Sequence, residues 1–123
     1  MKNIFPPNIS CLLFFVLFFS SCGKYLTETG NASYYGDQFV HKQMANGKKF
    51  SQHNLTAAHK TLPLGTKVTV VNLSNHKRTK VRITDRGPFV KDRIIDLSKK
   101  AAKKIDMIDQ GVVMVELRYK KKR

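Results

Sequence analysis

Two consecutive runs of β-branched residues constrain the fold of this chain more than any other feature. Residues 66–73 (TKVTVVNL) and 77–85 (KRTKVRITD) are separated only by the short polar segment Ser74-Asn75-His76. Two β-rich runs joined by such a segment predict an antiparallel hairpin. A hairpin of two strands is therefore expected between residues 66 and 85.

Side-chain alternation in the second run predicts which residues share a face of the strand. Val81 and Ile83 lie on one face, and strict alternation adds Asp85 to that face. The basic residues between them would face solvent: Arg78, Lys80 and Arg82. The strand is thus expected to end in a carboxylate aligned with its apolar side.

The rest of the sequence also favours a mainly β fold. Further short strands are predicted at residues 31–36, 55–59, 93–97 and 112–119. One helix is predicted from Lys99 to about Ile108, with Ser98 as its N-cap, because Ala101, Ile105 and Ile108 recur at helical spacing. Several short strands and one helix within one domain favour a small closed barrel over a layered α/β sheet.

The first 21 residues are typical of a secretory signal peptide. Lys2 is followed by the apolar run 11–19 (CLLFFVLFF) and by the small residues Ser20 and Ser21. The alternative is a buried hydrophobic helix, but Pro6, Pro7 and the short length of the run disfavour it. Residues 1–21 are therefore excluded from the predicted domain.

Cys22 follows the small residues directly, and residues 19–22 (FSSC) resemble a bacterial lipobox. That resemblance implies cleavage before Cys22, lipidation of its thiol and a short tether over residues 22–29. The chain has two cysteines, and Cys11 lies inside the signal segment, so no disulfide can form within one mature chain. The alternative is plain secretion with a free thiol.

The positive charge of the chain predicts an anionic partner. The formal net charge is +15, and removal of residues 1–21 takes away only Lys2, leaving +14. Such a field attracts nucleic acid, acidic phospholipid or acidic glycan. The export signal argues against nucleic acid, so an envelope polymer such as peptidoglycan is the expected partner. Residues 120–123 form a basic tail.

An ordered set of motifs is similar to the rare lipoprotein A family. The motifs are GNASYYG (30–36), ANG (45–47), LTAAHKTLP (55–63), VNL (71–73), ITDRGPF (83–89) and RIIDLS (93–98). The resemblance extends over residues 30–119. It implies a six-stranded double-psi β-barrel with one or two short helices, related to expansins. It also implies an outer-membrane lipoprotein facing the periplasm, monomeric and without a cofactor.

The resemblance implies lytic transglycosylase activity on peptide-poor glycan strands, in cell-wall remodelling or septation. Such an enzyme cleaves the β-1,4 bond after N-acetylmuramic acid without water and leaves a 1,6-anhydro end. One carboxyl group can donate a proton to the leaving oxygen and later accept one from the sugar.

Asp85 is the first candidate for that carboxyl group, and His59 is expected to assist it. From the residues alone, Asp85 could instead cap the turn of the DRGPF segment, and His59 could be a structural histidine. Asp96 is a possible supporting acid. Its alternative role is to interact with the start of the predicted helix.

One residue departs from the family pattern. Lys48 stands directly after Ala45-Asn46-Gly47, where the family has glutamate. A cation beside a carboxyl group favours the ionised form, so this exchange bears on catalysis rather than on binding. Lys48 could also pair with a muramic acid carboxylate or lie in solvent.

The remaining residues of the motifs are expected to bind substrate: Tyr34, Tyr35, Asn46, Arg86, Phe89 and Arg93. Tyr34, Tyr35 and Phe89 offer flat faces to sugar rings, although core packing is the alternative for at least one tyrosine. No metal site is expected, because His41, His53, His59 and His76 lack ligand-like spacing.

Three functions remain open from the sequence. The first is the transglycosylase, the second is a non-catalytic, expansin-like peptidoglycan binder, and the third is a basic nucleic-acid-binding protein. The first is favoured by the resemblance, and the second is kept open by Lys48. The third conflicts with the predicted signal peptide.

Overall fold

The chain folds into a closed barrel of six strands. The computed structural model describes residues 25–121, and the predicted signal peptide and Cys22 lie outside this range. The elements in chain order are β1 (Tyr25–Tyr34), the 3-10 helix η1 (Asp37–Phe39), β2 (Thr56–His59), β3 (Lys67–Asn72), β4 (Arg78–Asp85), β5 (Arg93–Leu97), α2 (Lys99–Lys104) and β6 (Val113–Lys120). The predicted mainly β barrel is therefore confirmed.

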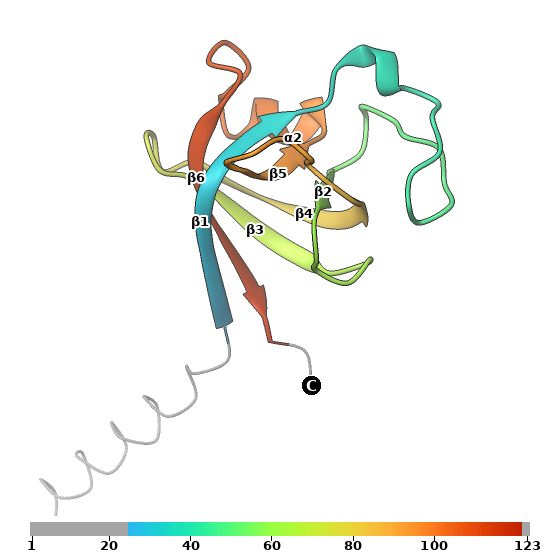
Figure 1. Ribbon diagram of the computed structural model, residues 1–123. Helices are drawn as coiled ribbons and strands as arrows, with labels where there is room; N and C mark the ends of the chain where they lie inside the picture. Colours follow the sequence, from blue (N-terminus) through green and yellow to red (C-terminus); the bar gives the residue numbers. More distant parts are fainter. Residues whose placement is uncertain (1–24, 122–123) are drawn as a thin grey trace, which may run out of the picture. The chain divides into compact units, whose positions relative to one another are not determined.

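The strands do not follow one another around the barrel in chain order. The order is β1-β5-β2-β4-β3-β6, so β2 and β5 lie side by side between β1 and β4 (Figure 1). The β3–β4 pair is antiparallel, as predicted, whereas β1 pairs with β5 and β2 pairs with β4 in parallel. Parallel neighbours need long connections, and the connection from β1 to β5 contains the motifs from ANG (45–47) to ITDRGPF (83–89).

Alternating apolar residues fill the barrel. Val68 and Val70 of β3 face Val81 and Ile83 of β4, and all four are buried. Ile95, Leu97, Val115 and Leu117 complete this interior from β5 and β6, each with no exposed surface. Burial of a side chain of this size contributes about 1.5–3 kcal/mol, so these residues strongly stabilise the closed barrel.

The helix closes one end of the interior, but it is shorter than predicted. Ser98 accepts a hydrogen bond from the Ala101 N–H and is the N-cap, as expected. The helix ends at Lys104 because Asp106 adopts a left-handed conformation with φ 57°. The Met107 N–H then bonds the Ala102 carbonyl, a reversed turn that directs Met107 into the core.

The first strand begins five residues before the predicted domain boundary at Gly30. β1 starts at Tyr25, so residues 25–29 of the predicted tether are strand. Tyr25, Thr27 and Thr29 favour an extended backbone, which is a signal that the tether prediction overlooked. The part of the chain that the structure describes contains no helix long and apolar enough to cross a bilayer.

Candidate functional site

Two aspartates lie in register on the two strands that flank β2 in the barrel. Ala58 of β2 pairs with Asp96 of β5 on one side and with Asp85 of β4 on the other. Ser33 of β1 extends this row, because it pairs with Asp96. Two strand spacings separate the Cα atoms of the aspartates, which is about 10 Å. Ala58, a residue with a small side chain, lies between them in this row.

A bulge in β4 brings Asp85 into this row. Ala57 pairs with Ile83, but Ala58 pairs with Asp85, so Thr84 is the extra residue. Ala57 and Ile83 both face the core, and Ala58, the next residue of β2, faces the opposite side. The predicted alternation therefore does not extend to Asp85, which leaves the apolar face of Val81 and Ile83. A bulge of one residue leaves no clear mark in the sequence.

Three hydrogen-bond donors hold the Asp85 carboxyl group. The Tyr35 hydroxyl donates to Oδ2 at 2.6 Å. The backbone N–H groups of Ala45 and Arg86 donate to Oδ1 at 2.8 Å and 2.9 Å. The side chain is half-buried, so these contacts fix its orientation while one side stays open to solvent. The carboxyl group is thus placed as a hydrogen-bond acceptor.

Tyr35 connects Asp85 with a hollow on the barrel surface. Its ring packs against Phe50 at 4.4 Å and edge-on to Phe39 at 5.4 Å between centroids. Burial of the phenol, its hydrogen bond to Asp85 and the charges of Asp85 and Asp96 raise the pKa of Tyr35 well above its ordinary value. The phenol therefore remains protonated at neutral pH and continues to donate to Asp85.

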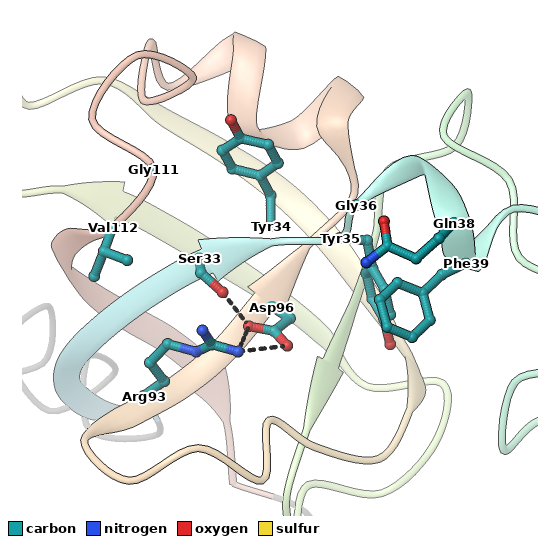
Figure 2. A pocket seen from close by; sticks show the side chains of 10 residues that line it. All are labelled: Ser33, Tyr34, Tyr35, Gly36, Gln38, Phe39, Arg93, Asp96, Gly111 and Val112. Carbon is teal, nitrogen blue, oxygen red and sulfur yellow. Dashed lines mark hydrogen bonds and ion pairs between the residues drawn. The ribbon is translucent and has the colours of Figure 1, made fainter.

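Asp96 lies inside the hollow, which has a volume of about 410 Å³ (Figure 2). Its carboxylate accepts a hydrogen bond from the Ser33 hydroxyl and lies 3.5 Å from the Arg93 guanidinium. The Arg93 Nε–H is buried and lacks a hydrogen-bond partner among the described residues. The hollow is also lined by Tyr34, Tyr35, Gly36, Gln38, Phe39, Gly111 and Val112. Its lining combines aromatic rings with one carboxylate and one guanidinium group.

His59 is buried away from this hollow. Its Nδ1 accepts the backbone N–H groups of Thr61 and Leu62, both at 3.1 Å. Because Nδ1 is an acceptor, the neutral ring carries its proton on Nε2, which lies 2.8 Å from a Glu28 carboxylate oxygen. Both ring nitrogens are occupied, and the side chain is 5% exposed. Sequence reasoning missed Glu28, which lies in the predicted tether.

Lys48 lies in the loop that contacts Asp85. The Asn46 side chain accepts the Lys48 N–H at 2.9 Å, which forms the turn predicted at Ala45-Asn46-Gly47. Asn46 also donates its backbone N–H to the Thr84 carbonyl, and Ala45 bonds Asp85. The Lys48 side chain is exposed. It forms no ion pair with any residue in the range 25–121.

The other sequence candidates divide into two groups. Tyr34 donates its hydroxyl to the Ile108 carbonyl, and Arg86 donates to the carbonyls of His59 and Leu62, so both tie parts of the barrel together. Phe89, in contrast, is 87% exposed on the loop between β4 and β5. Tyr34 also lines the hollow, together with Tyr35 and Arg93, so the structure brings these predicted binding residues to one place.

Sequence reasoning missed Ser33 and Gln38 at the hollow, and Ala58 between the aspartates. The only sequence signal for Ser33 and Ala58 was that they belong to the motifs GNASYYG and LTAAHKTLP, and Gln38 lies two residues after the first of these. Across residues 25–121, no three histidine, cysteine or acidic side chains gather in a way that could hold a metal ion.

Comparison with known proteins gives a consistent match. A family model described as lytic transglycolase matches residues 27–117. The endolytic peptidoglycan transglycosylase RlpA of Campylobacter jejuni is 54% identical over 91 residues, which cover 74% of this chain and 33% of that protein. The chain spans about a third of the length of the curated relatives it matches.

Solved structures with low sequence identity share the fold. The Streptomyces papain inhibitor superposes with a TM-score of 0.61 at 24% identity, covering 77% of this chain and 96% of that one. The expansin of Clavibacter michiganensis superposes with a TM-score of 0.56 at 14% identity, covering 79% of this chain and 51% of that one. The barrel is therefore one that several unrelated activities use.

Proposed function

The chain belongs to the lytic transglycolase family of RlpA-type double-psi β-barrels, and on this premise we propose that it cleaves peptidoglycan glycan strands. The bond cleaved is the β-1,4 linkage after N-acetylmuramic acid, and the product is a 1,6-anhydro end. The observation that carries the proposal is the row of Asp85, Ala58 and Asp96 next to the aromatic hollow.

Asp85 acts as both acid and base in the proposed reaction. In its protonated form it donates to the glycosidic oxygen, and the bond between that oxygen and the anomeric carbon breaks. The sugar's own 6-hydroxyl then bonds to the anomeric carbon and returns its proton to Asp85, so no water is consumed. The three donors from Tyr35, Ala45 and Arg86 hold the carboxylate in place between the two steps.

The hollow binds the glycan next to the reacting bond. Its aromatic rings offer faces for sugar stacking, and the charged pair of Asp96 and Arg93 offers a carboxylate and a guanidinium for sugar hydroxyl and carboxylate groups. Phe89, exposed on the next loop, adds a further apolar face. We assign His59 a structural role, because its two ring nitrogens bond Glu28 and the turn after β2.

The domain works at the cell envelope in this proposal. The predicted signal peptide and the lipidation of Cys22 would anchor it to a membrane, most consistently the outer membrane facing the periplasm. Stable anchoring requires more than one acyl chain, which lipidation of this kind supplies. Peptidoglycan then lies within reach of the barrel.

The proposal is tested by digestion of peptide-free glycan strands with the chain that starts at Cys22, followed by mass spectrometry. We expect 1,6-anhydro ends from the unaltered chain and none from Asp85→Asn. Asparagine keeps an oxygen for the two backbone donors, and its amide can donate to the Tyr35 hydroxyl, so the melting temperature should hardly change. Full activity of a folded Asp85→Asn variant would refute the role of Asp85.

A second function is that of a domain that binds glycan without cleaving it. It is kept open by Lys48, which stands in the loop that contacts Asp85 where the family resemblance implies a glutamate. Sedimentation with peptidoglycan and no new ends would identify this case, and Lys48→Glu would then restore cleavage. Cleavage by the unaltered chain would exclude it.

A further inference from the structure

The outer surface of β3, β4 and β6 carries a cluster of cations that the proposed reaction does not use. Along β4 the buried residues Thr79, Val81 and Ile83 alternate with exposed basic ones. The neighbouring strands add cations at matching positions of the register. This surface, here called the basic face, consists of Lys67, Arg78, Lys80, Arg82 and Arg118.

The basic face is nearly free of compensating negative charge. Arg118 pairs with Glu116 at 2.6 Å. Within residues 25–121, the other four cations have no carboxylate within ion-pair distance. Lysines elsewhere do find partners, since Lys99 pairs with Asp37 and Lys77 lies 3.6 Å from Asp106. Apart from Glu116, the acidic residues within the range 25–121 thus form no ion pair on this surface.

The arrangement of these cations costs stability and does not protect a strand edge. Lys67 and Arg82 are direct cross-strand partners, and like charges at such positions repel. Proteins often place lysines on exposed edge strands to prevent aggregation, but this barrel is closed and has no edge. An external anion would neutralise this repulsion, so binding of an anionic partner gives the cluster of cations a function.

The basic face is centred on β3, opposite the strand that carries Asp96, and its β4 cations precede Asp85 at the end of that strand. β3, at its centre, is three strands from β5 in either direction around the six-stranded barrel. Asp96 and the hollow belong to the β5 side. A surface bound through β3 would therefore leave the hollow open to solvent.

We propose that the basic face docks on a bilayer surface rich in anionic phospholipid. Strands β3 and β4 contain no aromatic residue, whereas sugar and single-stranded nucleic-acid sites use aromatic stacking. A cluster of cations without stacking groups fits a surface that presents phosphate charge alone. Alternate residues of β4 place cations about 7 Å apart along the outer face of the strand.

The length of chain before the barrel supports this partner. β1 begins at Tyr25, only three residues after Cys22. Six residues separate Cys22 from Glu28, which bonds His59 in the barrel, and they span at most about 20 Å, roughly two Debye lengths at physiological salt. If Cys22 is lipidated, as the proposed localisation requires, the barrel stays within this distance of the headgroups, and the short tether raises the effective concentration of the basic face at the bilayer. Docking itself goes beyond the proposed function and does not depend on cleavage.

The test measures binding of the unlipidated chain from Cys22 to vesicles by co-sedimentation. Neutral phosphatidylcholine vesicles are compared with vesicles that contain about a third phosphatidylglycerol. We expect binding only to the anionic vesicles, weakened by salt. In the variant Lys67→Gln/Arg78→Gln/Lys80→Gln/Arg82→Gln, affinity should fall at least fiftyfold, since each charge near such a surface contributes about fivefold.

A matched control removes the same number of charges from another surface. Lys91, Lys100, Lys103 and Lys104 are all exposed, and their joint change to glutamine should lower affinity by less than about fivefold. Equal loss in both variants would overturn the proposal, because net charge alone would then explain binding. Equal binding to neutral vesicles would also overturn it.

The alternative partners are outcomes of the same experiment. If the basic-face variant loses affinity for peptidoglycan or for duplex DNA but keeps it for anionic vesicles, the membrane assignment is wrong. Digestion of soluble glycan should be unchanged in this variant, which separates docking from cleavage. The pairs Lys67→Gln/Arg82→Gln and Arg78→Gln/Lys80→Gln serve if the fourfold variant does not fold. Each pair should lose at least tenfold in affinity.

Discussion

Substitutions of His59 can distinguish a catalytic role of this residue from a structural one. In the structure its ring connects the first strand to the turn after β2: Nε2 bonds Glu28, and Nδ1 accepts the N–H groups of Thr61 and Leu62. The change His59→Ala removes all three contacts. The changes His59→Asn and His59→Gln separate these contacts. The asparagine oxygen can replace Nδ1 as the acceptor, and the glutamine amide can replace Nε2 as the donor.

The expected loss can be worked out from these contacts. Each of the three hydrogen bonds contributes about 1 kcal/mol, the central value, because solvent at the exposed Thr61 and the partly exposed Glu28 offsets the extra strength of a bond to a charged group. His59→Ala should therefore cost about 3 kcal/mol in the free energy of unfolding. For a domain of this size that lowers the melting temperature by about 12–24 °C.

The assay is thermal unfolding followed by circular dichroism, with glycan digestion at a temperature where every variant is folded. We expect His59→Asn to lose less stability than His59→Ala, since it keeps the turn, and both variants to retain more than a tenth of the activity. Wild-type stability together with abolished cleavage in His59→Ala would refute the structural role. Glu28→Gln keeps an acceptor for Nε2 and should change the melting temperature by only a few degrees.

Three further predictions concern the site and its surroundings. Tyr35→Phe removes the donor to Asp85 but keeps the aromatic packing, so cleavage should fall about tenfold or more while the melting temperature drops by only a few degrees; unchanged rates would exclude the proposed positioning. Phe89→Ala should leave stability unchanged, because the ring is 87% exposed, and should weaken glycan binding as measured by sedimentation; unchanged affinity would remove Phe89 from the binding surface. The hydrogen bond from Lys99 lowers the pKa of the Asp37 carboxyl group below its ordinary 3.8. The ionised carboxylate therefore stabilises the folded chain above pH 4, and this stabilisation is lost as the pH falls through the lowered pKa. Asp37→Asn should accordingly melt slightly below the unaltered chain at pH 7 and together with it at about pH 2, and a constant difference would contradict this assignment.

The elements of the fold were predictable because their signals are local. The hairpin of β3 and β4 follows from two β-branched runs, and the helix start follows from Ser98. The end of the helix was placed four residues too late, because Ile105 and Ile108 kept the helical spacing while Asp106 reversed the chain. The order of strands in the barrel was available only through resemblance, since parallel pairing joins segments far apart in sequence.

The site was predictable as a set of residues but not as an arrangement. Motif matching selected Asp85, Asp96 and Tyr35, which the structure brings to one region. It also joined His59 to Asp85, because both belong to strong motifs, whereas the His59 ring nitrogens contact the turn after β2 and Glu28. The bulge at Thr84 and the contact of the Ala45 N–H with Asp85 depend on tertiary packing and have no counterpart in the sequence pattern.

The central claim is that the glycan's own hydroxyl, assisted by Asp85, displaces the leaving sugar. Digestion of peptide-free glycan strands in water enriched in heavy oxygen tests it most directly. The account predicts that the new ends, analysed by mass spectrometry, contain no oxygen from the solvent and that Asp85→Asn produces no new ends. New reducing ends that carry solvent oxygen would show hydrolysis and contradict the account.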